Sequence, residues 1–236
     1  MAILWQILQG KEEMILTKIK ISDLFEQGHT IAWEIFDGAE YPWEILDKIS
    51  SFIEELGRTL PEDEYTLLKE NVWIANDAKV APTASISGPC IIDHGAEIRH
   101  CAFIRGSAIV GKNSVVGNSC ELKNCVLFDG VQVPHFNYVG DSVLGYKSHM
   151  GAGAVTSNVK SDKTLVTVKD GDEKIPTGRK KFGAVLGDLV EVGCNSVLCP
   201  GSIIGRESTV YPTSLVRGAV PERSIFKKGG VVVAKK

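Results

Sequence analysis

The stretch that decides the fold is residues 74–126, which read IANDAKVAPTASISGPCIIDHGAEIRHCAFIRGSAIVGKNSVVGNSCELKNCV. A branched aliphatic residue stands at every sixth position, and the residue four places after each is small in eight of nine cases. The aliphatic positions are Ile74, Val80, Ile86, Ile92, Ile98, Ile104, Val110, Val116 and Leu122, and the second positions are Ala78, Ala84, Cys90, Ala96, Ala102, Ala108, Ser114, Cys120 and Val126. A period of six fits neither a helix nor a simple alternating strand; it fits short strands joined by corners.

Three such strands close a triangular coil, and stacked coils bury the aliphatic residues in ladders while their backbones pair in parallel. The sequence therefore predicts a parallel β-helix over residues 71–226. After Leu122 the apolar positions are Leu127, Val133, Val139, Leu144 and Met150, so that two steps of five interrupt the steps of six. Such five-residue steps indicate a bulge or an altered corner, where function often resides. The hexads resume at Leu186, so the polar, basic residues 157–184 are predicted to form a loop extruded from the coil.

Residues 1–70 follow other rules and are predicted to form a mainly helical segment, while residues 227–236 are read as a tail. Residues 39–57 read AEYPWEILDKISSFIEELG, in which Pro42 suits a first helical turn, Gly57 suits a helix end, and apolar residues recur at helical spacing. We expect this segment to cap an open end of the coil, where strand edges would otherwise stay unpaired. A remnant of a larger domain is the alternative.

The composition excludes several classes of protein. With 44% hydrophobic and 23% charged residues, the chain is neither disordered nor collagenous. The six cysteines lack a CxxC pair and indicate neither disulfides nor a thiolate metal site. No long apolar run and no cleavable leader are found, so we expect a cytoplasmic protein with no membrane partner. The net charge of −3 is uneven, because residues 1–70 carry 6 basic and 15 acidic side chains and leave an excess of +6 for the remainder. A modest positive excess of this kind suits phosphorylated small molecules better than nucleic acid.

A more specific signal than the hexads lies in residues 121–158, which read ELKNCVLFDGVQVPHFNYVGDSVLGYKSHMGAGAVTSN. With TGRKKFGAVLGD at 177–188, this segment resembles the acetyltransferase domain of the bifunctional N-acetylglucosamine-1-phosphate uridyltransferases, especially archaeal-type relatives with a PHxNYVGDS block. The resemblance covers residues 71–226 and implies the left-handed coil of that family. The predicted fold class is therefore all-β, a left-handed parallel β-helix with an extruded loop and an N-terminal α-helical segment.

The resemblance also implies an acceptor site. Its general base falls on His135: an amine that attacks the thioester of acetyl-CoA must lose a proton, and histidine, with an unperturbed pKa of about 6.5, takes one at neutral pH. Its phosphate-binding cations fall on Arg105 and Lys123, which suit a sugar phosphate. The other implied substrate-binding residues are Tyr138, His149, Asn158 and Lys163. His149 stands where the bacterial enzymes have an asparagine, which bears on the identity of the acceptor.

The resemblance also implies where the acetyl donor binds: acetyl-CoA lies along an edge of the coil against Ala152, Cys194 and Pro212. Lysines of the loop, with Arg179, would neutralise its phosphates. No required metal is predicted. Because that family completes each site with a neighbouring subunit, we expect a homotrimer.

The expected function is an acetyl-CoA-dependent N-acetyltransferase that converts an amino-sugar phosphate, with glucosamine 1-phosphate as the first candidate, to N-acetylglucosamine 1-phosphate. Residues 1–70 show no Gly-rich nucleotide loop and are too few for a uridyltransferase domain, so pyrophosphorylase activity is not expected. Two alternatives remain: a non-catalytic trimeric module that binds a sugar phosphate or regulates, and an acetyltransferase with another amino-sugar acceptor. A zinc carbonic anhydrase is disfavoured because the histidine spacings do not match its ligands.

Overall fold

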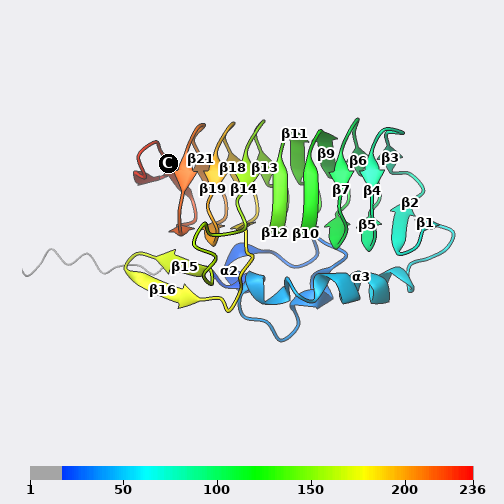
Figure 1. The fold of residues 1–236 in the computed structure, drawn as a ribbon, viewed down its shortest axis with the longest axis horizontal. Helices are drawn as coiled ribbons and strands as arrows, with labels where there is room; N and C mark the ends of the chain where they lie inside the picture. The colour runs from blue at the N-terminus through cyan, green and yellow to red at the C-terminus, as the bar shows by residue number, and fades with distance from the viewer. Residues whose placement is uncertain (1–17, 236) are drawn as a thin grey trace, which may run out of the picture.

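The computed structural model describes residues 18–235, and its main body is a coil of short parallel strands stacked on three faces (Figure 1). Face 1 carries β2 (Val72–Ala75), β5 (Cys90–Ile92), β8 (Ala108–Val110), β17 (Ala184–Leu186), β20 (Ser202–Ile204) and β23 (Ala219–Val220). Face 2 carries β4 (Ser85–Ile86), β7 (Phe103–Ile104), β14 (Val155–Thr156), β19 (Val197–Leu198) and β22 (Leu215–Val216). Face 3 carries β3 (Lys79–Val80), β6 (Glu97–Ile98), β9 (Val115–Asn118), β11 (Gln132–His135), β13 (His149–Met150), β18 (Glu191–Val192), β21 (Thr209–Val210) and β24 (Ser224–Phe226). The predicted parallel β-helix is confirmed.

The hexad aliphatics form the interior of the coil. From Ile86 to Leu122 each of them is at most 6% exposed. Burying one such side chain stabilises the fold by about 1.5–3 kcal/mol. The ladder from coil to coil is therefore the main source of stability of the solenoid.

The predicted irregularity is a tightened corner between faces 2 and 1. Two longer strands, β10 (Glu121–Leu127) and β12 (Tyr138–Leu144), run through this corner without a break. The early coils repeat every 18 residues, as in the pairing of Ile74 with Ile92, whereas Leu122 pairs with Val139 after 17. Asn124 and Asp141 turn the shortened corners with φ of 51° and 48°, a conformation that Asn and Asp tolerate better than most residues.

The N-terminal segment lies along face 1 (Figure 1). Its elements are α2 (Ile21–Leu24), η1 (Trp33–Phe36), η2 (Pro42–Ile45), α3 (Ile49–Gly57) and β1 (Tyr65–Lys69). The expected helix is present but divided, with Pro42 opening η2 and Gly57 closing α3. The helix α3 does not cap an open end as expected: it packs along the side of the coil, against β5, β8 and β10, while β1 covers an edge of the first coil. The physical reason is the outer ladder of face 1, where Ile91, Ile109 and similar residues are fully buried and need an apolar cover.

Antiparallel strands, and not helices, close one edge at each end of the coil. β1 pairs with β2 of the first coil, so residues 1–70 include a strand that the sequence did not predict. β25 (Val232–Ala234) pairs with β24, so the expected tail is partly a strand. The extruded loop leaves the coil after β14 and returns at β17, and it carries a hairpin of β15 (Thr167–Asp170) and β16 (Glu173–Pro176).

Candidate functional site

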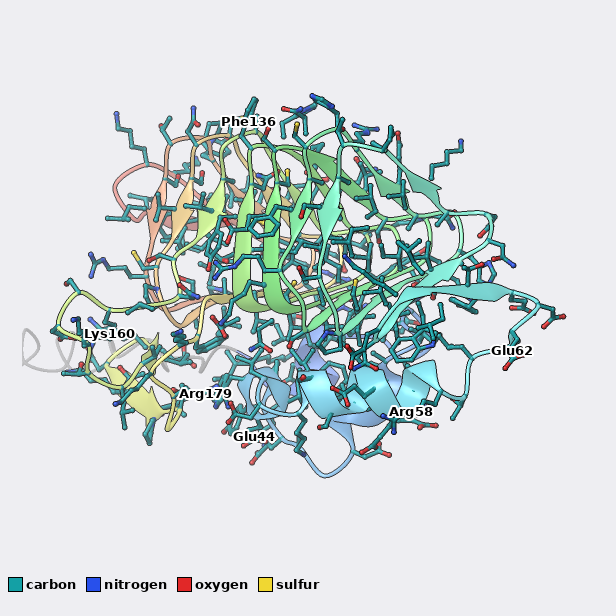
Figure 2. The ribbon with its side chains drawn as sticks, turned by 45° about the vertical axis from the view of Figure 1, so that its right-hand side comes forward. Glu44, Arg58, Glu62, Phe136, Lys160 and Arg179 are labelled. Carbon is teal, nitrogen blue, oxygen red and sulfur yellow. The ribbon has the colours of Figure 1, made fainter. Side chains whose placement is uncertain are left out.

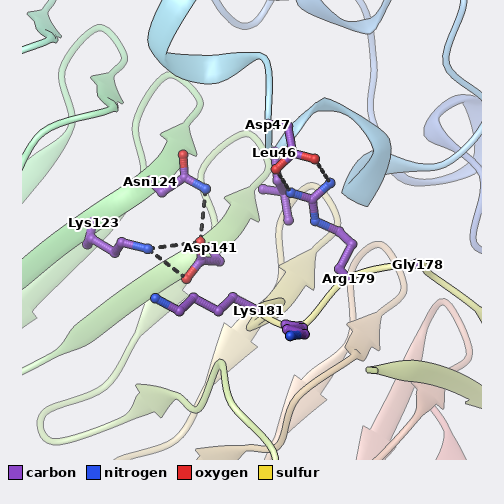
Figure 3. Close-up of a pocket in the computed structure, with 9 residues that line it drawn as sticks. Leu46, Asp47, Lys123, Asn124, Asp141, Gly178, Arg179 and Lys181 are labelled. Carbon is purple, nitrogen blue, oxygen red and sulfur yellow. Dashed lines mark hydrogen bonds and ion pairs between the residues drawn. The ribbon is translucent and has the colours of Figure 1, made fainter. Parts of the chain in front are cut away.

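Asp141 is the centre of a polar network at the tightened corner. Its carboxylate is 5% exposed and accepts hydrogen bonds from Lys123 Nζ at 3.1 and 3.2 Å and from Asn124 Nδ2 at 2.9 Å (Figure 3). Asn158 Nδ2 donates to its Oδ2 at 2.5 Å. Three donors on one buried carboxylate hold the negative charge and fix the direction of each donor side chain.

Tyr138 connects this network to face 2. Asn158 Nδ2 also donates to the phenol oxygen of Tyr138, at 3.2 Å. Burial of the phenol, followed by the nearby negative charges of Asp141 and Glu121, raises the pKa of Tyr138 above its ordinary value. The hydroxyl therefore keeps its proton at neutral pH and has one to donate to a ligand.

Arg105 lies one coil before Lys123 at the same corner, because Ile104 pairs with Leu122. Its guanidinium donates to Glu121 Oε1 at 2.6 Å. Glu121 is in turn the strand partner of Tyr138. The structure thus brings both predicted cations to one corner, each beside its own carboxylate.

His135 ends β11 at the other edge of face 2, three residues before Tyr138 and so within about 10 Å of it along the chain. Its backbone N–H donates to the side-chain oxygen of Asn137 at 3.1 Å, and the amide of Asn137 donates to Gly151 O and Ala154 O. Asn137 is 2% exposed, so it anchors the backbone of His135. The imidazole itself is exposed and makes no hydrogen bond within residues 18–235, so one of its nitrogens is available to a ligand.

The residues predicted to contact acetyl-CoA form a column that starts at His135. Gly153 N–H donates to His135 O at 3.0 Å, Asn195 N–H to Ala152 O at 2.9 Å, and Thr213 N–H to Cys194 O at 2.8 Å. Ala152, Cys194 and Pro212 therefore stand at the same edge in successive coils, about 4.8 Å apart. Cys194 and Pro212 are exposed, which leaves this column open to a long ligand.

Two predicted residues lie away from the network. His149 sits on face 3, where its Nδ1 is 2.8 Å from Glu191 Oε2, and its strand partner is Gln132. Lys163 is exposed in the loop, and its backbone N–H bonds to Lys160 O. Neither side chain contacts Tyr138 or Asp141.

A cavity of about 450 Å³ opens beside Lys123. It is lined by Leu46, Asp47, Lys123, Asn124, Asp141, Gly178, Arg179, Lys180 and Lys181. Arg179 binds both carboxylate oxygens of Asp47, and Lys181 extends toward Asp141 (Figure 3). Lys180 and Lys181 form no ion pair within the described part of the chain, so four cations face two carboxylates and the cavity favours an anion.

The sequence did not single out Asp141, Asn124 or Asp47. The first two occupy the five-residue steps that had marked the corner as irregular, which was the available signal. Asp47 comes from the N-terminal segment and reaches the cavity only because that segment lies along face 1. No sequence pattern gives that placement.

The outer surface of face 2 carries a mostly apolar ladder. Paired from coil to coil are Ser85, Phe103, Glu121, Tyr138, Val155, Val197 and Leu215. Phe103 is 41% and Leu215 57% exposed. The equivalent ladder on face 3 is mostly polar, from Lys79 and Glu97 to Glu191 and Thr209. Face 2 is therefore the flat face best suited to contact another protein surface.

Within residues 18–235 there is no group of three or more His, Cys, Asp or Glu side chains arranged to hold a metal ion. No helix in the same range is both long and apolar enough to cross a membrane.

Comparison with known proteins gives a consistent result. The profile of the GMPPB C-terminal domain matches residues 86–228. A bifunctional sugar-1-phosphate nucleotidylyltransferase/acetyltransferase of Sulfurisphaera tokodaii is 37% identical over 46% of this chain and 27% of its own length. The bifunctional protein GlmU of Methanococcus maripaludis is 31% identical over 83% of this chain and 48% of its own. The chain thus spans about half, or less, of the length of these relatives.

Among solved structures, the acetyltransferase domain of PglB from Neisseria gonorrhoeae, in complex with acetyl coenzyme A, is 17% identical with a TM-score of 0.33. That similarity covers 78% of this chain and 63% of the other. GDP-perosamine N-acetyltransferase from Caulobacter crescentus, as a point mutant in complex with CoA and GDP-perosamine, is 16% identical with a TM-score of 0.31, over 78% of this chain and 65% of the other.

Proposed function

The chain belongs to the family of the GMPPB C-terminal domain, and from that premise we propose that it is an acetyl-CoA-dependent N-acetyltransferase whose acceptor is an amino-sugar phosphate, with glucosamine 1-phosphate as the first candidate. The observation that carries the proposal is the network of Lys123, Asp141, Asn158 and Tyr138 beside an anion-favouring cavity. The name of the Sulfurisphaera tokodaii relative, a bifunctional sugar-1-phosphate nucleotidylyltransferase/acetyltransferase, supports it.

In this proposal the acceptor phosphate binds at the tightened corner. Lys123, Lys180 and Lys181 neutralise its charge. The guanidinium of Arg105 leaves Glu121, its partner in this structure, and binds the phosphate instead. The sugar lies across face 2 against Tyr138 and Asn158. This arrangement directs its amine toward His135 at the other edge.

The reaction then needs a base for the amine and an acetyl donor. His135 takes a proton from the amine as the nitrogen attacks the thioester carbonyl, so that a C–N bond forms. When the tetrahedral intermediate collapses, the C–S bond breaks and the proton passes to the departing CoA thiolate. Backbone N–H groups of the Gly-rich turn next to His135 supply hydrogen bonds to the oxyanion, and acetyl-CoA lies along the column of Ala152, Cys194 and Pro212.

A homotrimer is part of the proposal. The exposed apolar ladder on face 2 passes through Tyr138, so contact between subunits there would both bury Phe103 and Leu215 and enclose the acceptor. We expect a mass of about three times the 25.6 kDa of the chain by light scattering.

An acetyltransferase with another amino-sugar acceptor is the second candidate, and the position of His149 favours it. Its side chain pairs with Glu191 on face 3 and does not reach Tyr138. The sugar contact that the family's asparagine makes is therefore not reproduced by this side chain.

The test is thiol release from acetyl-CoA with glucosamine 1-phosphate, galactosamine 1-phosphate or an amino-sugar nucleotide. We expect turnover with at least one of these, and we expect His135→Ala to lower kcat by about 10²-fold or more with the fold intact. Arg105→Ala should mainly raise KM for the acceptor. Release with none of them, from a folded trimer, would instead favour a non-catalytic module, and full activity of His135→Ala would remove the assigned base.

A further inference from the structure

A second cavity, of about 290 Å³, lies under the hairpin of β15 and β16. It is lined by Lys160, Thr167, Lys169, Lys174, Cys199, Pro200, Arg217 and Gly218. It shares no lining residue with the cavity beside Lys123. The outgoing limb of the loop, at Lys160, borders this second cavity, and the returning limb, at Arg179, borders the first (Figure 2).

The charges of this cavity are all of one sign. Its lining holds three lysines and one arginine and no carboxylate. Lys160 lies 3.4 Å from Asp162, but Lys169, Lys174 and Arg217 form no ion pair anywhere in residues 18–235. Three cations without an ion pair around one hollow make a positive potential that favours an anion.

The hairpin itself adds like charges. Lys169 and Lys174 are direct partners across the antiparallel strands β15 and β16. Like charges at directly opposed positions destabilise a strand pair. An anion between the two ammonium groups would turn this repulsion into attraction.

The backbone of the hairpin is held in place by tight packing on the coil. Gly218, with φ of 83°, approaches so closely that a Cβ there would lie 2.5 Å from Lys169 O. Gly201, with φ of 81°, approaches Thr167 O in the same way, at 2.9 Å. The backbone of Lys169 is therefore fixed beside Arg217, so less conformational entropy is lost when a ligand binds.

We propose that this cavity is a second anion site that binds a phosphate or diphosphate group carrying at least two negative charges. Lys169, Lys174 and Arg217 bind the phosphate oxygens, and Lys160 borders the site. The site is separate from the cavity at Lys123, and its existence does not depend on acetyl transfer. Its phosphate comes either from the nucleotide end of CoA or from an independent phosphorylated ligand.

The test uses the full chain and inorganic pyrophosphate, with binding measured by calorimetry at low and at physiological salt. We expect Lys169→Ala/Lys174→Ala to weaken binding by about tenfold or more. The matched control is Lys227→Ala/Lys228→Ala, which removes the same charge from a turn outside both cavities and should bind as the parent does. Lys169, Lys174 and Lys228 are exposed and Lys227 is half-buried, and circular dichroism checks that both variants fold.

The source of the phosphate is found by repeating the titration with CoA and dephospho-CoA. If the double variant weakens CoA and not dephospho-CoA, the site takes the 3′-phosphate of the donor; if it weakens pyrophosphate alone, the ligand is independent. If the parent binds no pyrophosphate, or the double variant binds all three ligands as the parent does, the proposal is wrong. His135→Ala should keep this binding, so failure of catalysis and failure of the second site are distinguishable.

Discussion

Replacing Asp141 by asparagine tests the network at the tightened corner. The substitution keeps the shape of the side chain but removes the charge that Lys123 and two amides share. A hydrogen bond to a charged group contributes about 1.5–3 kcal/mol. The Nδ2 group of the new asparagine would also place its hydrogens against side chains that are themselves hydrogen-bond donors. We expect Asp141→Asn to lower the free energy of unfolding by about 3 kcal/mol, which for a chain of this size lowers Tm by about 6–12 °C.

The matched control is Asp188→Asn. Asp188 is 1% exposed and accepts backbone N–H bonds from Glu26 and Tyr146, both at 2.8 Å, but it lies outside the proposed site. We expect both variants to lose stability by calorimetry, while only Asp141→Asn raises KM for the acceptor, by about tenfold, because Lys123 loses its orientation. An unchanged Tm for Asp141→Asn, or an equal rise in KM for both variants, would refute the reasoning.

Three further predictions concern other parts of the chain. Burial and the hydrogen bond to Asp93 raise the pKa of Tyr65, so its contribution to stability is full below pH about 10 and is lost as pH rises toward that raised pKa. Tyr65→Phe should lower the free energy of unfolding by about 1–3 kcal/mol at pH 7 and weaken the loss of stability at alkaline pH, both measured by urea titration. An unchanged dependence of stability on alkaline pH would contradict this prediction. Acetyl-CoA should slow labelling of the exposed thiol of Cys194 but not of exposed Cys101, measured by mass spectrometry; equal rates would argue against the donor column. Gly57→Ala should destabilise by about 1–3 kcal/mol in urea, because a Cβ there overlaps an indole ring; parent-like stability would show that the ring moves aside.

Much of the coil was predictable because its periodicity is strictly local. One aliphatic residue per strand fixes the inward direction, and the two five-residue steps after Leu122 located the tightened corner. The chemistry of that corner was only half predictable: Lys123 was named from a resemblance, whereas its partner Asp141 is visible only when neighbouring coils are stacked in register.

The N-terminal segment was the part that local pattern could not place. Its apolar spacing predicted a helix near Pro42 to Gly57, and the helix exists in two pieces. Which surface it covers depends on the outer ladder of face 1, whose members, such as Ile109, stand next to the hexad positions. The role of Asp47 in the first cavity follows from that long-range choice.

The same segment changes how this solenoid comes apart. In an ordinary repeat protein each coil contacts only its neighbours, and unravelling begins at an end. Here α3 lies on early coils, the ring of His29 stacks on Tyr146 at 3.7 Å between centroids in a middle coil, and Lys18 reaches Glu222 in the last, at 2.9 Å. One segment thus contacts early, middle and late coils, and we expect it to couple their unfolding.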